Sequence, residues 1–217
     1  MVITIDGHAG AGKSSAARLL AVALGFELLN TGAMYRAVAY ALGQAGVDID
    51  AEPRDAGRVE RLAAGWTFDL AGTRVRLNHD DLTDHIYTDV MGQGASRVGT
   101  FREVRERLKA EQRRLAAGRD VICEGRDQGT AVFPDAPVKF FLTASPETRA
   151  ARQAEREGGR PAKYVQSIID RDGRDEGREL DPLRQAADAV RIDSSDLSMD
   201  EVLARMLEVV EQCRPDS

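Results

Sequence analysis

Aromatic residues, cysteines and long apolar runs are all scarce in this sequence. Aromatic residues make up 5% of the chain, and its two cysteines, Cys123 and Cys213, lie far apart with no CxxC motif. We therefore expect reduced, structural thiols in a cytoplasmic protein, and no cysteine metal site. No apolar stretch approaches the ~18 residues of a membrane span. Because an apolar strand begins at the N-terminus, we also expect no secretory signal.

Net positive charge is absent as well. The 217 residues carry a formal net charge of −6, which argues against general nucleic-acid binding but allows a locally basic pocket. The length is that of one ordinary domain, and we find no fixed-period repeat or low-complexity segment. We expect a monomer that binds neither nucleic acid nor membranes.

A glycine-rich loop follows a β-branched run at the N-terminus. Residues 7–14 read Gly-His-Ala-Gly-Ala-Gly-Lys-Ser, and the residues after them favour a helix. Such glycines let successive backbone N–H groups point into one hollow at a helix N-terminus, which suits a polyphosphate. Lys13 can reach the β- and γ-phosphates, and the Ser14 hydroxyl can bind Mg²⁺. A plain glycine-rich turn is disfavoured because spacing, strand and helix agree.

Two neighbours of this loop receive weaker interpretations. We interpret Asp6 as support for the strand end and the loop, and His8 as a loop residue that exposes its backbone N–H. His79 and His85 are interpreted as surface or packing residues.

Short apolar strands alternate with helices along the chain. This pattern predicts an α/β fold with a five-stranded, mostly parallel sheet flanked by helices. Strands are expected at residues 2–6, 26–30, 121–123, 138–142 and 189–193. Helices are expected at residues 13–24, 32–44, 56–64, 101–117, from 145, 164–172 and from 198 to about 213. Alternating residues at 66–77 predict a small antiparallel hairpin inside an inserted subdomain, residues 65–95.

Polar side chains cluster where the expected strands end, which is where such sheets bind ligands. Arg36 follows the second strand, and Arg126 and Asp127 follow the third. Ordinary salt bridges are the alternative for this pair, but neighbouring glycines favour a phosphate and hydrogen-bonding site. Residues 171–178 have the charge pattern of a solvated helix end, and their two glycines predict a poor, mobile helix. So many arginines in an acidic chain suggest a kinase for a phosphorylated acceptor.

Six stretches carry a family resemblance that covers nearly the whole chain: residues 7–14, 31–36, 101–105, 125–130, 133–139 and 171–183. In order and spacing they resemble bacterial cytidylate kinases, and the last five separate this family from adenylate, guanylate, thymidylate and shikimate kinases. The resemblance implies one P-loop kinase domain over residues 1–217. Residues 65–95 would form its nucleotide-monophosphate-binding insert, and residues from about 149 to 180 its lid. It further implies transfer of the γ-phosphate of ATP, with Mg²⁺, to CMP or dCMP in pyrimidine metabolism.

The resemblance also implies roles for individual residues, carried over motif by motif. ATP is expected at Gly7, His8, Ala9, Gly10, Ala11, Gly12, Lys13, Ser14, Ser15, Arg149 and Arg152. The acceptor phosphate is expected at Arg36, Arg126 and Arg178, the ribose at Arg171 and Asp175, and the cytosine at Ser96, Arg105 and Asp127. Thr31 and Tyr35 complete the expected CMP site. Catalysis is assigned to Lys13, Arg126 and Arg178, and the metal to Ser14 through the phosphates.

One departure from the family concerns position 176, which commonly carries a small hydroxyl residue. Here it is Glu176, which stands beside Asp175 and leaves the preference between ribose and deoxyribose open. Position 14 also departs from some relatives, which have glycine where this chain has the usual magnesium-binding hydroxyl.

Other functions remain open from the sequence alone. One is a kinase for another small acceptor, such as UMP, AMP or shikimate. Another is a nucleotide-binding switch, although the Asn-Lys-x-Asp stretch of guanine-specific switches is absent. A nucleic-acid-dependent motor fits a small acidic domain poorly. Since the acceptor phosphate is already anionic, phosphoryl transfer needs positioning and charge stabilisation rather than a strong base.

Overall fold

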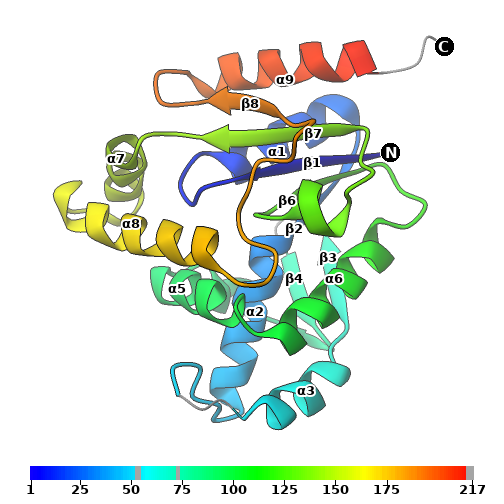
Figure 1. The fold of residues 1–217 in the computed structure, drawn as a ribbon, viewed down its shortest axis with the longest axis vertical. Coiled ribbons are helices and arrows are strands. Elements are labelled where there is room, and N and C mark those ends of the chain that lie inside the picture. The colour runs from blue at the N-terminus through cyan, green and yellow to red at the C-terminus, as the bar shows by residue number, and fades with distance from the viewer. Residues whose placement is uncertain (52–54, 72–73, 214–217) are drawn as a thin grey trace. The chain divides into compact units, whose positions relative to one another are not determined.

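The computed structural model of the protein describes residues 1–51, 55–71 and 74–213 (Figure 1). The chain divides into two compact units. The phosphate-loop unit comprises residues 1–28 and 118–217, and the middle unit comprises residues 29–117. In the part of the chain that is described, no helix is long and apolar enough to cross a membrane.

A five-stranded sheet has the order β2-β6-β1-β7-β8, with β1 at its centre. β1 pairs in parallel with β6 and β7, and β7 pairs in parallel with β8. The strands are β1 (Val2–Gly7), β2 (Glu27–Asn30), β6 (Val121–Glu124), β7 (Val138–Thr143) and β8 (Val190–Asp193). Together with the flanking helices, this sheet confirms the α/β fold expected from the alternation of strands and helices.

The phosphate-loop unit buries its apolar residues between this sheet and the helices of the same unit. Ile5 on β1 and Leu142 on β7 belong to one buried cluster with Leu20 and Met206 from two helices. Apolar side chains on both faces of a strand are what a parallel sheet covered by helices requires. The helical elements of this unit are α1 (Lys13–Leu24), the π-helical turn η1 (Gln128–Val132), α7 (Pro146–Glu157), α8 (Ala162–Gly177) and α9 (Met199–Cys213).

Helix boundaries in this unit follow local capping rules. α1 ends before Gly25, whose φ of 70° is left-handed, as the expected helix over 13–24 requires. α7 begins after Ser145, whose hydroxyl accepts a 3.1 Å hydrogen bond from the backbone N–H of Thr148. Ser198 and Glu201 form the expected capping box, with hydrogen bonds of 2.8 and 3.2 Å in the two directions.

The end of α8 corrects one expectation. The helix continues to Gly177, so the prediction of a poor helix over residues 171–178 is wrong. Tertiary contacts hold the last turn: the Asp175 carboxylate accepts a hydrogen bond from Arg126 Nε at 2.8 Å, and its carbonyl accepts one from the Leu183 N–H at 2.8 Å. Such contacts outweigh the cost of about 1 kcal/mol for a glycine inside a helix.

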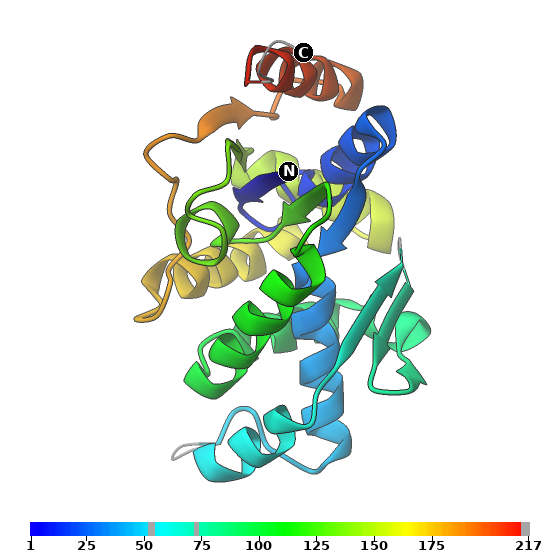
Figure 2. The ribbon, with the colours of Figure 1, turned by 90° about the vertical axis from the view of Figure 1, so that its right-hand side faces the viewer.

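The middle unit is helical with a small sheet. The antiparallel strands β3 (Phe68–Ala71), β4 (Arg74–Leu77) and β5 (Asp80–Asp81) follow one another in that order. β3 and β4 confirm the expected hairpin, and Figure 2 shows them as a paired ribbon beside α2. The helices are α2 (Thr31–Gln44), α3 (Ala56–Ala64), α4 (Thr83–Ile86), α5 (Asp89–Val98) and α6 (Arg102–Ala116). β5, α4 and α5 were not expected from the sequence.

Candidate active site

The glycine-rich loop connects β1 to α1 at the carboxyl end of the sheet. Gly7 has a φ of 138°, and a Cβ placed there would lie 1.8 Å from the carbonyl oxygen of Leu142 on β7. Only glycine therefore fits where the loop passes β7. Gly12 has a φ of 90° immediately before α1 begins. The loop thus leads into a helix N-terminus, where backbone N–H groups can receive an anion.

Lys13 is buried beneath this loop. Its side chain donates a 2.6 Å hydrogen bond from Nζ to the carbonyl oxygen of His8. Burial lowers the pKa of Lys13 well below its usual value, and Arg126 lowers it further, whereas Glu124 and Asp175 oppose the shift. A phosphate beside Lys13 would favour the charged ammonium again, so this environment fits a polyanion.

Ser14 lies next to the buried carboxylate of Glu124, for which the sequence alone predicts no role. Its hydroxyl donates a 2.9 Å hydrogen bond to Oε1 of Glu124, the last residue of β6. The sequence does show an acidic residue at the end of a buried strand, and this position could have indicated a role for Glu124. Across residues 1–51, 55–71 and 74–213, no group of three or more His, Cys, Asp or Glu side chains could hold a metal ion. Mg²⁺ is usually bound by one or two protein oxygen ligands together with substrate phosphates, so an ion beside Ser14 would share phosphate oxygens.

Asp6 anchors the segment after β6 to the end of β1. Its carboxylate accepts hydrogen bonds from the backbone N–H groups of Gln128 at 2.9 Å and Gly129 at 2.7 Å. Burial raises the pKa of Asp6 to about 7, although these two hydrogen bonds oppose the shift. Asp6 thus supports the end of β1, as expected, but the segment it holds is the one directly after Arg126 and Asp127.

Arg126 and Asp175 form a buried ion pair. Arg126 Nε lies 2.8 Å from Oδ2 of Asp175, and the two side chains are 18% and 4% exposed. Burial favours a higher pKa for Asp175, but Arg126, Arg171 and Arg178 outweigh it and lower the pKa to about 2. The fold thus brings together four of the residues expected around CMP, although their contacts with that nucleotide stay predictions.

Two arginines of α7 are connected to the glycine-rich loop, Arg149 directly and Arg152 through Ser194. Arg149 donates to the carbonyl oxygen of Ala9 at 3.2 Å and pairs with Asp172 of α8 at 2.6 Å. Arg152 donates to the Ser194 hydroxyl at 3.0 Å, and this hydroxyl in turn donates to a loop carbonyl. Their expected contact with ATP stays a prediction, but both already position the loop.

Of the remaining residues expected at CMP, the buried Asp127 belongs to the phosphate-loop unit, and the other five belong to the middle unit. Arg36 donates from Nη1 to the carbonyl oxygens of Ile86 at 3.1 Å and Thr88 at 3.2 Å. Arg105 is 1% exposed and donates to the carbonyl oxygen of Gly99 at 3.3 Å. Also in this unit are Thr31 and Tyr35 on α2 and the buried Ser96 on α5. Their roles stay predictions.

Comparisons with known proteins agree with a phosphate-binding loop that has arginines around it. The sequence model of the family described as Cytidylate kinase matches residues 3–212. The chain belongs to the cytidylate kinase family. It is 43% identical to a protein named Cytidylate kinase from Rhodopirellula baltica over 98% of this chain and 93% of the relative. It is 44% identical to one of the same name from Methylococcus capsulatus over 97% and 96% of the two chains.

A solved structure shares the fold at much lower sequence similarity. An uncharacterized protein from Eubacterium ventriosum is 14% identical, with a TM-score of 0.51 over 97% of this chain and 98% of that chain. Membership of the cytidylate kinase family confirms the resemblance of the six motifs. It also makes the chain an ATP-dependent phosphotransferase with nucleotide substrates.

Proposed function

We propose that this enzyme transfers the γ-phosphate of ATP to CMP or dCMP, giving ADP and CDP or dCDP. The observation that carries the proposal is the cluster of Lys13, Arg126 and Asp175 at the carboxyl end of the sheet, in a chain of this family. Lys13 stands where a donor polyphosphate would lie, beneath a glycine loop. Arg126 offers a planar, charged fork for a second phosphate.

The donor side of the proposed site is the loop from Gly7 to Ser15. Lys13 would contact the β- and γ-phosphates, and Arg149 and Arg152 would hold the loop against α7 close to ATP. Mg²⁺ would be held by the phosphates and Ser14, with Glu124 accepting from the Ser14 hydroxyl or from a metal-bound water. Bound there, the metal ion would neutralise charge on the β- and γ-phosphates.

The acceptor side is proposed from the residues that the family motifs assign to CMP. Arg36, Arg126 and Arg178 are proposed for the phosphate of CMP, and Arg171 and Asp175 for the ribose, with Thr31 and Tyr35 nearby. Ser96, Arg105 and Asp127 are proposed for the base. Cytosine offers an exocyclic amino donor beside two acceptors, so an acceptor such as Asp127 and a donor such as Arg105 suit it. Uracil has a carbonyl oxygen in place of the amino group and should be disfavoured.

The chain's own residues supply charge stabilisation and positioning rather than a proton acceptor. The attacking oxygen of the acceptor phosphate is already anionic, and charge develops on the transferring group and the leaving oxygen. Lys13, Arg126 and Arg178 are proposed to stabilise that charge, with Asp175 fixing the orientation of Arg126. Residues 65–95 are proposed as the acceptor-binding insert, and residues from about 149 to 180 as a lid that excludes water. We further propose a cytoplasmic monomer.

The test is ADP release in a coupled assay with Mg-ATP and a panel of acceptors. The panel contains CMP, dCMP, UMP, AMP, GMP, dTMP and a sample without acceptor. We expect fast turnover with CMP and dCMP and none without acceptor. Equal rates with UMP would keep the kinase and contradict the proposed roles of Asp127 and Arg105. Slow ADP release that ignores every acceptor would instead favour a nucleotide-binding switch.

A further inference from the structure

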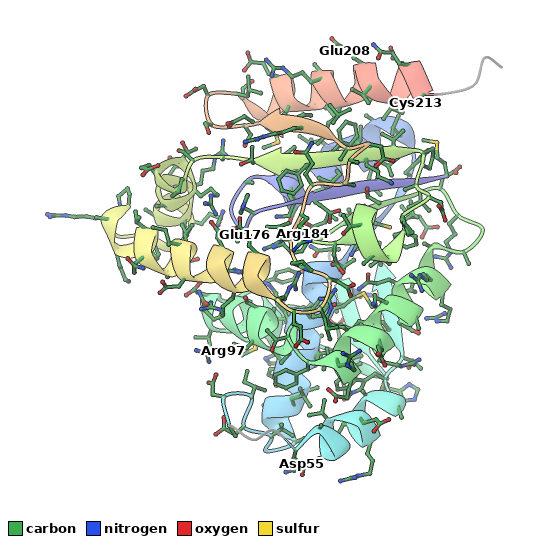
Figure 3. The ribbon with its side chains drawn as sticks, in the orientation of Figure 1. Asp55, Arg97, Glu176, Arg184, Glu208 and Cys213 are labelled. Atoms are coloured by element: carbon green, nitrogen blue, oxygen red, sulfur yellow. The ribbon has the colours of Figure 1, made fainter. Side chains whose placement is uncertain are left out.

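His8 and Glu176 form a contact that joins the glycine-rich loop to the end of α8. His8 Nε2 lies 2.7 Å from Oε1 of Glu176, although the two residues are 168 positions apart in the chain. Figure 3 labels Glu176 near the C-terminal end of α8, on the side toward β1. Neither side chain received such a role from the sequence, which left His8 as a loop residue and Glu176 as a possible neighbour of the ribose.

The His8 ring is held on two sides. Its side chain is 18% exposed, whereas that of Glu176 is 54% exposed. The ring meets Phe141 of β7 edge-on, with 6.0 Å between the ring centroids and an angle of 83° between the planes. Nδ1 is buried and has no hydrogen-bond partner among the described residues. A ring that donates from Nε2 to Glu176 and keeps Nδ1 as a bare acceptor leaves no N–H group unsatisfied.

The backbone of the same residue orients the lysine of the site. The carbonyl oxygen of His8 accepts the 2.6 Å hydrogen bond from Lys13 Nζ. Ring and carbonyl belong to the same residue, so a ring that is held on two sides restrains the backbone that presents this acceptor to Lys13.

α8 also links Glu176 to Arg126, the arginine proposed for the acceptor phosphate. Glu176 directly follows Asp175, whose carboxylate holds Arg126 at 2.8 Å. One helical turn thus carries two adjacent acidic residues with different partners. Asp175 fixes the arginine of the acceptor side, and Glu176 fixes the loop that carries the lysine of the donor side.

We infer that Glu176 is a positioning residue for phosphoryl transfer, which acts through His8 to hold Lys13 and Arg126 in a fixed relation. This inference rests on the function proposed above for the same site. A hydrogen bond to a carboxylate as exposed as that of Glu176 contributes little to global stability, so its loss should appear in kcat and not in folding. Since small displacements of catalytic groups lower rates strongly, we expect a loss of about 5-fold in kcat.

Steady-state kinetics of the full-length protein with Mg-ATP and either CMP or dCMP test this inference. E176A should lower kcat about 5-fold for both acceptors, leave both KM values within about 2-fold and leave the CMP-to-dCMP ratio unchanged. E176Q should restore kcat to within about 2-fold, because its amide oxygen still accepts from Nε2–H. The matched control is D170A, because Asp170 is an exposed acid of α8 whose one side-chain hydrogen bond among the described residues comes from Gln166 in the same helix.

A double-mutant cycle separates this coupling from independent effects. In an H8A background, which already lacks the ring, E176A should lower kcat no further. Additive losses in H8A and E176A would overturn the inference, as would wild-type kcat in E176A. An altered CMP-to-dCMP ratio in E176A would place Glu176 at the ribose instead, and would equally overturn it.

Amide hydrogen exchange of the protein without nucleotides keeps the inference testable if the proposed function fails. Backbone amides of residues 8–14 should exchange several-fold faster in E176A than in wild type, and at the wild-type rate in E176Q and D170A. Unchanged exchange in E176A would refute the positioning role whatever the acceptor. Absence of CMP phosphorylation by the wild-type protein would contradict the proposed function alone.

Discussion

Buried carboxylates have different partners in the two compact units. In the phosphate-loop unit, the buried Asp175 pairs with Arg126, and the partly buried Asp172 pairs with the buried Arg149. In each pair the two residues come from separate segments of the chain. In the middle unit, Glu111 of α6 accepts from Arg114 of its own helix and from the backbone N–H of Phe68 at 3.0 Å.

The partners indicate what each acid does. Burial favours a higher pKa for Glu111, but the hydrogen bonds from Arg114 and Phe68 lower it. These bonds tie β3 to α6, and Arg114 also donates to the carbonyl oxygen of Phe68 at 3.1 Å. Around Asp175, by contrast, three guanidinium groups gather at the carboxyl end of a parallel sheet. We therefore expect Glu111, whose partners include a backbone N–H group, to stabilise the fold, and Asp175, which has three arginines around it beside a phosphate loop, to orient groups for a ligand.

The largest expected effect is that of Lys13→Met on turnover. We expect kcat to fall about 100- to 1,000-fold, the range for removing one group that stabilises transition-state charge. Because burial lowers the pKa of Lys13, the unliganded protein should lose no stability. Steady-state assays and thermal melts measure the two effects.

A second buried lysine of the same unit provides the control for this variant. Lys139 donates from Nζ to the carbonyl oxygen of Pro134 at 2.5 Å and pairs with Asp188 at 2.8 Å. Lys139→Met should therefore melt earlier and keep kcat within about 3-fold. If both variants lost kcat equally, the assigned difference between the two lysines would be wrong.

The next effect belongs to the middle unit and should appear in stability alone. Glu111→Ala removes the acceptor of a buried N–H group and two arginine contacts, so we expect a loss of about 3 kcal/mol in the free energy of unfolding. Urea unfolding measures this loss. Turnover of the folded protein at low temperature should stay within about 2-fold of wild type. A large fall in kcat would mean that Glu111 serves the site as well as the fold.

The difference between the two units also marks what the sequence could predict. Local signals succeeded: Gly25 predicted the end of α1, and Ser198 with Glu201 predicted the start of α9. The glycine-rich loop followed from its spacing and the strand before it. These features depend on residues within a few positions of one another, where backbone conformation and capping chemistry decide the outcome.

Features that depend on distant partners were not predictable. Residues 171–178 looked like a poor helix because Gly173 and Gly177 are visible in the sequence, whereas the buried pairing of Asp175 with Arg126 is not. Glu124 received no role because its contact with Ser14 joins residues 110 positions apart. Short elements such as β5, with two residues, are set by pairing with β4 rather than by their own composition.

A pH-dependent loss of stability should distinguish the Asp175 pair from ordinary surface charges. The pKa of Asp175 is about 2 in the folded protein, against a usual value of 3.8. A lowered pKa means stabilisation that is present above pH 4 and lost as the pH falls toward 2, worth about 2 kcal/mol in total. Asp175→Asn removes the titrating group. The stability difference between wild type and this variant should therefore narrow by about 1 kcal/mol between pH 5 and pH 3. A difference that does not change with pH would mean that Asp175 contributes through its shape and hydrogen bonds alone.

The smallest expected effect concerns an exposed ion pair of the middle unit. Arg97, labelled in Figure 3, lies 2.6 Å from Asp50, but the two side chains are 44% and 57% exposed. Solvent screens such charges, so Asp50→Asn should change the free energy of unfolding by less than about 1 kcal/mol and leave kcat unchanged. The Arg97–Asp50 distance is shorter than the 2.8 Å of the Arg126–Asp175 pair. Distance alone would therefore predict a larger contribution to stability from the exposed pair. A loss in Asp50→Asn as large as that in Asp175→Asn would show that burial does not separate functional ion pairs from surface ones in this protein.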